Sequence, residues 1–173
     1  MVSHSAGQMA PSAVVVVLLL IVVAGVLVDG LYLLTVRHGA YRVAADAALQ
    51  GVRAGTDYWH YITQGEMRLN PAVAVSQAMD VVDAGVAPWG LEGHTVQVEV
   101  LADPDGGTIA NFPPYPSAQQ QGGTTWQEDR PAVGVYVQAD VPAFFLGWFN
   151  GNMPITVHAF GASLVETESA ALP

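Results

Sequence analysis

The residue types that most often carry chemistry are sparse and scattered in this chain. There is no Cys, which excludes disulfides, cysteine nucleophiles and Cys-ligated metal centres. The five His lie far apart in the sequence, and no zinc-protease, nucleophile-elbow, phosphate-loop or dinucleotide-binding signature occurs. The sequence therefore predicts a non-enzymatic protein with no catalytic residue, no cofactor and no small-molecule substrate.

Two acidic clusters have residue types that could bind a metal ion. Asp57 and His60 are three residues apart and could meet on a helix, but two ligands do not make a metal site. Asp103 and Asp105, followed by two glycines, resemble the opening of a calcium-binding loop. An EF-hand needs a bidentate Glu at its twelfth position, where this chain has Pro114. We therefore predict no metal site, and a looser calcium site stays the alternative to a solvated turn.

Charge divides the chain into two parts. The formal net charge is −10, and charged residues make up 12% of the chain, about half the share in an ordinary soluble domain. Acids and Arg balance up to residue 68, so the whole net charge lies in residues 69–173, where Arg130 is the one base. Five scattered Arg argue against nucleic-acid binding, which needs clustered cations. The pattern predicts an apolar anchor followed by an acidic domain.

The anchor is an apolar segment near the N-terminus. Residues 13–28 carry no polar side chain, and the apolar run resumes after Asp29 and Gly30. A helix over residues 13–36 would be about 36 Å long, enough to cross a hydrocarbon core of about 30 Å. Residues 1–12 contain no Lys or Arg, and the segment is longer than the apolar core of a signal peptide. We predict a retained transmembrane helix over 13–36 after a short tail, 1–12.

Asp29 is the one charged residue inside this span. A carboxylate at the centre of a membrane helix costs about 2.5–3.5 kcal/mol, and less near an interface. It is also too far from Arg37 for a direct pair within one helix. We therefore expect that Asp29 either lies near the outer interface or meets a partner from another chain.

The helix is predicted to continue through residues 37–55 and to end at Gly55. Helical spacing places one apolar face on this extension, made of Tyr41, Ala44, Ala45, Ala48, Leu49 and Val52. Small residues also form two rows that would let another backbone approach closely: Ala40, Ala44 and Ala48, and Ala47, Gly51 and Gly55. We expect this part to pack on the acidic domain, on copies of itself, or on both.

The N-terminal quarter of the chain resembles a known family. A Val28-Asp29 pair ends the apolar helix, Tyr32 and Arg37 follow, and residues 44–49 read Ala-Ala-Asp-Ala-Ala-Leu. This order, over residues 12–55, is similar to that of the TadE/TadG-like pilus-assembly proteins, pilin-like minor components of the Flp (Tad) pilus. The resemblance implies a helix-packing and assembly role for Asp29, Tyr32, Arg37 and the small-residue rows.

The resemblance also implies a place in the cell and a topology. It implies a single-pass protein of the bacterial cytoplasmic membrane with its C-terminal domain outside, in the periplasm or at the cell surface. Arg37 and Arg42, counted by the positive-inside rule, favour the opposite orientation. Members with a prepilin-type leader have Glu five residues after the Gly at the cut, and Ser12 would stand there if Gly7 marked it. This departure favours an uncleaved, membrane-retained member.

The acidic domain, residues 56–173, is predicted to be α+β. Tyr58, Trp59 and Tyr61 suit a membrane interface or a domain seam, and the distance from the span favours the seam. Asn70 is a predicted N-cap, Gly85 a predicted C-cap and residues 71–84 the helix between them. Alternating apolar residues predict half-buried strands at Thr95–Leu101 and Ala132–Val141, and a less regular strand follows at Ile155–Val165.

Two further segments of the acidic domain leave alternatives open. Residues 102–131, rich in Pro, Gly and Gln, form a loop insert that we expect to be functional or mobile. Residues 142–153 contain an aromatic cluster that is either a buried hairpin tip or an exposed patch for a partner or the membrane. The candidate patch residues are Phe144, Phe145, Trp148 and Phe149.

Together these features predict a pilin-like outline, in which a long N-terminal transmembrane helix continues into a small antiparallel β-sheet domain. The expected function is assembly of a Tad/Flp-type pilus or a related surface filament. Expected partners are membrane lipid, other pilus or envelope proteins and further copies of the chain, with no nucleic acid. Two alternatives remain: a single-pass accessory subunit of a membrane protein complex, with Asp29 meeting a partner helix, and a major filament subunit.

Overall fold

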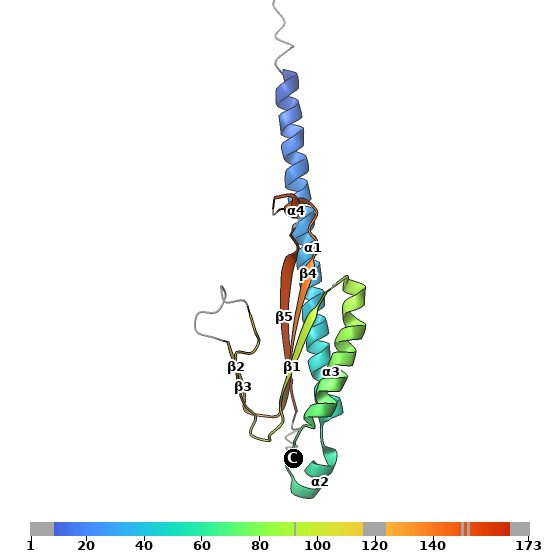
Figure 1. Ribbon diagram of the computed structural model, residues 1–173, viewed down its shortest axis with the longest axis vertical. Helices are drawn as coiled ribbons and strands as arrows, with labels where there is room; N and C mark the ends of the chain where they lie inside the picture. The colour runs from blue at the N-terminus through green and yellow to red at the C-terminus, as the bar shows by residue number, and fades with distance from the viewer. Residues whose placement is uncertain (1–8, 92, 116–123, 150, 152, 167–173) are drawn as a thin grey trace, which may run out of the picture.

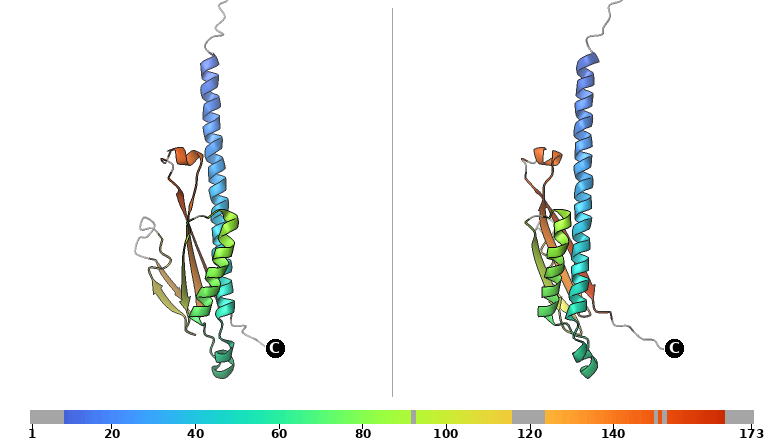
Figure 2. Two further views of the ribbon diagram at one scale, coloured as in Figure 1. Left: turned by 45° about the vertical axis from the view of Figure 1, so that its right-hand side comes forward. Right: turned by 90° about the vertical axis from the view of Figure 1, so that its right-hand side faces the viewer.

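One continuous helix, α1 (Met9–Gly55), forms the long axis of the molecule (Figure 1). The computed structural model describes residues 9–91, 93–115, 124–149, 151, 153–166. The predicted span and its extension are therefore a single unbroken helix, which begins inside the predicted tail and ends at Gly55 as expected. Gly7 lies outside the described residues. The N-terminal part of α1 projects beyond all other elements (Figure 2).

Three antiparallel strands build the main sheet, in the order β1-β4-β5. They are β1 (Thr95–Leu101), β4 (Ala132–Val141) and β5 (Ile155–Leu164), which confirms the three predicted strands almost residue for residue. Val135 in the central strand pairs with Val98 on one side and Gly161 on the other. A long apolar helix followed by a small antiparallel sheet confirms the α+β class.

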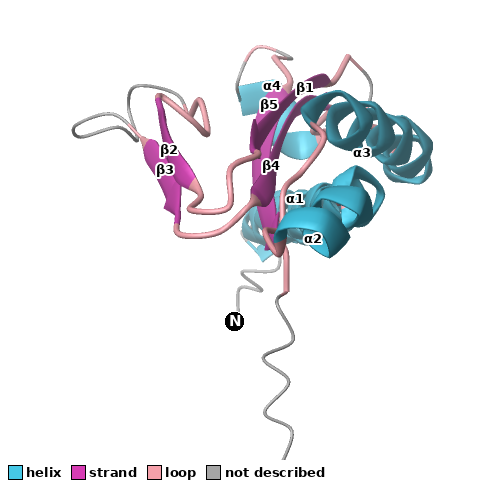
Figure 3. Ribbon diagram, turned by 90° about the horizontal axis from the view of Figure 1, so that it is seen from below, coloured by secondary structure: helices cyan, strands magenta, loops and turns pink. Residues whose placement is uncertain are grey.

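Both faces of the sheet are covered (Figure 3). On one face, α1 and α3 (Pro71–Val86) enclose a core of Ala and Val side chains with the sheet. On the other face, Phe112 and Trp126 pack above the central strand, where a Cβ on Gly134 would lie 2.8 Å from the Phe112 ring. The central strand is thus buried on both sides, whereas its alternating sequence had predicted a half-buried strand.

Residues 102–131 are more ordered than the sequence suggested. Two short strands, β2 (Gly107–Ala110) and β3 (Thr125–Glu128), form an antiparallel hairpin in which Ile109 pairs with Trp126. The expected unstructured insert is therefore wrong for the part of it that the structure describes. Strands of four residues contain too few apolar positions to establish a detectable alternation.

The buried face of α1 agrees with the predicted apolar face in part. Ala44, Ala48 and Val52 are buried as predicted, together with the rest of both small-residue rows, whereas Tyr41, Ala45 and Leu49 are exposed. The reason is close approach: a Cβ on Gly161 of β5 would lie 2.5 Å from the Ala45 backbone nitrogen. Bulky side chains would hold the helix and strand apart, so the sheet contacts the Ala and Gly face.

Two helical details of the acidic domain also differ from prediction. The Asn70 side chain caps α3 as predicted, but Gly85 lies inside the helix, which runs on to Val86. Gly85 is needed for packing, because a Cβ there would approach the Val43 side chain to 3.0 Å. A 3-10 turn, η1 (Ala87–Trp89), follows the helix.

The predicted aromatic seam is wrong as well. Tyr58, Trp59 and Tyr61 belong to a short helix, α2 (Tyr58–Gln64), at the end of the molecule farthest from the apolar part of α1 (Figure 1). All three side chains are exposed. A short helix with its own N-cap and C-cap holds them, and none of the residues that the structure describes forms a second layer over them.

Candidate functional site

Asp29 is the centre of a contact between segments far apart in the sequence. One of its carboxylate oxygens accepts hydrogen bonds from the backbone N–H groups of Phe145 and Leu146, at 2.6 and 2.8 Å. These two residues begin α4 (Phe145–Phe149), a short helix between β4 and β5. The Asp29 side chain therefore caps α4, and it is 3% exposed.

An apolar contact one turn earlier on α1 fixes the same helix. The Phe145 ring lies directly against Gly25, and a Cβ on this glycine would overlap the ring at 2.3 Å. Gly25 and Asp29 are four residues apart and so share one face of α1. Together they form a small docking site, with a flat glycine surface for the ring and an anion for the first backbone amides of α4.

The rest of α4 and its flanks present an exposed aromatic patch. The exposed fractions of Phe144, Trp148 and Phe149 are 82%, 83% and 71%, and Met153 is exposed beside them. We call these four residues the α4 patch. Of the four aromatic residues in the predicted partner patch, Phe145 alone turns inward, because its ring fills the space above Gly25.

The N-terminal half of α1 is apolar and exposed. From Ala13 to Ala24 every residue is exposed, and most carry Val, Leu or Ile side chains. Among the described residues, α1 is the one helix whose length and composition would allow it to cross a membrane. The α4 helix lies beside α1 where this exposed stretch ends (Figure 2).

A groove of about 470 Å³ opens between α1 and the start of β5. Arg37 and Tyr41 line it from the helix, with the guanidinium carbon 5.6 Å from the centre of the Tyr41 ring. Tyr115 and His158 line it from the sheet side. Burial raises the pKa of the Tyr115 phenol, so this side chain stays neutral over the whole physiological range.

A tyrosine–histidine pair lies beside this groove, with His158 in its lining. The Tyr136 hydroxyl and the Nδ1 atom of His158 are 2.6 Å apart. Burial raises the pKa of Tyr136 and lowers that of His158, because both charged forms lose solvation. The Tyr136 hydroxyl also lies 3.4 Å from Oε1 of Gln138, to which it can donate. The pair is polar and structural in character, and it joins two neighbouring strands.

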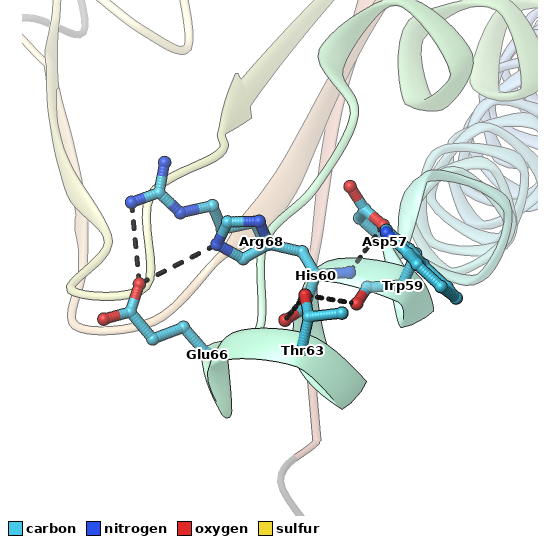
Figure 4. Close-up of polar contacts among 6 residues, drawn as sticks. All are labelled: Asp57, Trp59, His60, Thr63, Glu66 and Arg68. Carbon is cyan, nitrogen blue, oxygen red and sulfur yellow. Dashed lines mark hydrogen bonds and ion pairs between the residues drawn. The ribbon is translucent and has the colours of Figure 1, made fainter.

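The Asp57–His60 cluster is a helix cap (Figure 4). The Asp57 carboxylate accepts from the backbone N–H of His60 at 3.0 Å and so caps α2. The imidazole points toward Glu66 instead, with Nε2 3.9 Å from its carboxylate, which also pairs with Arg68 at 3.6 Å. Within the described residues no three His, Asp or Glu side chains are grouped as metal ligands.

The structure brings some of the predicted assembly residues together and separates others. Ala40, Ala44, Ala47, Ala48, Gly51 and Gly55 all lie in the interface of α1 with the sheet and α3. Tyr32 and Arg37 are exposed on α1, away from that interface. Asp29 meets the α4 backbone of its own chain, a third solution beside the two expected from the sequence.

Sequence reasoning missed Gly25 of α1, against which Phe145 of α4 packs, and Gly161 of β5, against which the α1 backbone packs. A glycine four residues before the one charge of an apolar span is the signal that could have indicated the first of these contacts. Comparisons of this chain with protein-family models, with curated proteins and with solved structures find no match.

Proposed function

We propose that this protein is a single-pass, membrane-anchored and non-enzymatic component of a Tad/Flp-type pilus or a related surface-filament assembly. The observation that most supports this proposal is the division of α1 into two halves. One half is apolar and exposed, and the other is packed against an antiparallel sheet. A filament subunit needs both parts, because the first can lie in lipid or among other helices while the second presents a folded domain. The resemblance of residues 12–55 to TadE/TadG-like proteins supports the same function.

In this proposal the acidic domain lies outside the cytoplasmic membrane. The large negative charge of residues 69–173 keeps such a domain soluble and leaves contacts to its surface groups. Arg37, counted as a positive-inside signal in the sequence, also lines the groove against Tyr41, whereas Arg42 is exposed and still favours the opposite orientation. The proposed orientation follows the family resemblance.

The accessory-subunit alternative depended on an unpaired Asp29 that would seek a partner helix. Two backbone N–H groups of the same chain now satisfy that carboxylate. The side chain is also almost fully buried. This reason for a partner helix is therefore removed, and the assembly function is the better supported of the two.

Chemical labelling in cells tests the orientation. The chain has no Cys, so Trp59→Cys on exposed α2 gives a single thiol in the acidic domain. We expect a membrane-impermeant maleimide to label it in intact spheroplasts as fully as after lysis. Labelling that appears after lysis alone would place the acidic domain in the cytoplasm and contradict the proposal.

Photo-crosslinking tests the assembly role. A photoreactive amino acid replaces Tyr32 or Leu31, which are exposed on α1 within one turn of Asp29. We expect crosslinks to pilus components or to further copies of the chain, and fewer surface filaments when the chain is deleted. Crosslinks exclusively to redox or transport subunits would favour the accessory-subunit alternative instead.

A further inference from the structure

The α4 patch is unusual because its exposed side chains are large, aromatic and contiguous with a membrane anchor. Phe144, Trp148, Phe149 and Met153 all lie on the short connection between β4 and β5. Residues 141–157 contain no Asp, Glu, Lys or Arg, although the domain around them is strongly acidic. A soluble surface seldom leaves such a patch uncovered, and a contact partner is the usual reason for one.

The depth of the patch follows from its docking to α1. The Phe145 ring lies on Gly25 and the first amides of α4 bond to Asp29, both within the apolar half of the helix. From Ala13, where the exposed apolar run begins, to Asp29 the helix rises about 24 Å, most of the thickness of a hydrocarbon core of about 30 Å. A bilayer that covers this run therefore ends near the level of α4.

We propose that the α4 patch enters the same bilayer that α1 spans, at the boundary between acyl chains and headgroups on the side of the sheet. This inference rests on the membrane-anchoring part of the proposed function and adds a second point of lipid contact. Aromatic side chains, Trp above all, favour this boundary, and the uncharged connection removes the main penalty for entering it.

The bonds at Asp29 fit this location. A carboxylate at the edge of a bilayer is costly unless hydrogen-bond donors surround it. The α4 backbone supplies two such donors and covers the side chain from surrounding solvent or lipid. The same contact fixes α4 against the anchor helix. The β-sheet domain is therefore held in a defined orientation relative to the membrane.

Site-directed spin labelling tests the depth of the patch directly. Because the chain has no Cys, Trp148→Cys and Phe149→Cys each give one label on the patch of the full-length protein. Val15→Cys, exposed on the apolar half of α1, is the reference for lipid, and Trp59→Cys on α2 is the reference for water. The proteins are reconstituted into phosphatidylcholine vesicles at low protein-to-lipid ratio, and collisions with oxygen and with a water-soluble nickel chelate are measured.

We expect the oxygen-to-nickel collision ratio at residues 148 and 149 to exceed that at residue 59 severalfold and to approach that at residue 15. If the ratio at residues 148 and 149 equals that at residue 59 while residue 15 is in lipid, the α4 patch does not enter the bilayer. The membrane anchor would still stand. Labels at 148 and 149 that are immobile and shielded from both reagents also overturn the entry of the patch into the bilayer, because a protein partner then covers the patch. Water access at residue 15 contradicts the anchor itself.

Discussion

The first half of α1 and the buried face of its second half are both apolar, yet they are built from different residues. Residues 13–24 are mostly Val, Leu and Ile, and all of them are exposed. The buried face of the second half is mostly Ala and Gly, with Val at the edges. The difference lies in the surroundings of each half. The side chains of residues 13–24 are exposed and can be bulky, whereas a β-strand backbone at contact distance from the second half leaves no room for bulky side chains.

The largest expected effect comes from filling the close contact in the packed half. Gly161→Val places a side chain where the Ala44 and Ala45 backbone already lies, and backbone cannot shift as a flexible side chain can. We expect the free energy of unfolding to fall by about 3 kcal/mol or more. Thermal unfolding of the full chain in detergent, followed by near-ultraviolet circular dichroism, measures the loss.

Val16→Leu in the exposed half is the matched control. It also enlarges an apolar side chain on α1, but the Val16 side chain is 57% exposed. We expect its unfolding temperature to equal that of the wild type. Equal losses in both variants would mean that the two halves are packed alike, contrary to the comparison.

The sequence predicts those features of the two halves that depend on local sequence patterns. Hydrophobic length predicted the span, and alternation predicted β1, β4 and β5, because each pattern is local and repeated many times. The small-residue rows predicted the buried face of the second half, whereas the apolar periodicity also placed Tyr41 and Leu49 there, which are exposed. Their size is what excludes them from a face that must accept the backbone of a glycine-containing strand.

The α4 contact could not be predicted for a different reason. Asp29 and Phe145 are 116 residues apart, and a single carboxylate carries no information about which backbone amides will reach it. The sequence could show that Asp29 needed donors, since a bare charge there is costly. It could not show that the connection between β4 and β5 of the same chain would supply these donors.

Removing the carboxylate tests the boundary between the halves. Asp29→Ala leaves the N–H groups of Phe145 and Leu146 without their acceptor. We expect α4 to detach locally, at a cost of about 1–3 kcal/mol. Amide hydrogen exchange at residues 145 and 146 measures it, and exchange there should become much faster.

Two variants act as controls for this prediction. Asp29→Asn keeps an acceptor oxygen and should retain most of the protection. Asp46→Ala removes an exposed carboxylate from the packed half of α1 and should leave exchange at α4 unchanged. Unchanged protection in Asp29→Ala would show that Phe145 alone holds α4 in place.

Two aromatic residues of α4 differ in what they contact: Phe145 packs against α1, whereas Trp148 is exposed. Phe145→Ser removes the ring from Gly25 and should lower the free energy of unfolding by about 1–2 kcal/mol. Trp148→Ser alters an exposed side chain and should change it by less than about 0.5 kcal/mol in detergent. Denaturant titration of both variants measures the difference. Equal destabilisation would mean that the α4 patch belongs to the core.

The smallest expected effect concerns pH and the sheet rather than the anchor. Burial lowers the pKa of His158 below its ordinary value of 6.5, with Asp140 opposing. The unfolded chain therefore binds the proton more readily than the folded one. The His158 contribution to stability is complete above about pH 6.5 and is lost as the pH falls through that value.

Comparing His158→Gln with the wild type isolates this contribution. Between about pH 8 and about pH 5.5 the wild type should lose more thermal stability than the variant, because His158 is the one side chain that the variant changes. Tyr136→Phe should lie between them, because it removes the hydroxyl that bonds to neutral Nδ1. If all three proteins show the same slope, the imidazole is as well solvated in the fold as in the unfolded chain, and its lowered pKa is wrong. If the unfolding temperature depends on pH in the wild type and in Tyr136→Phe but not in His158→Gln, the pH dependence originates in the sheet, at His158.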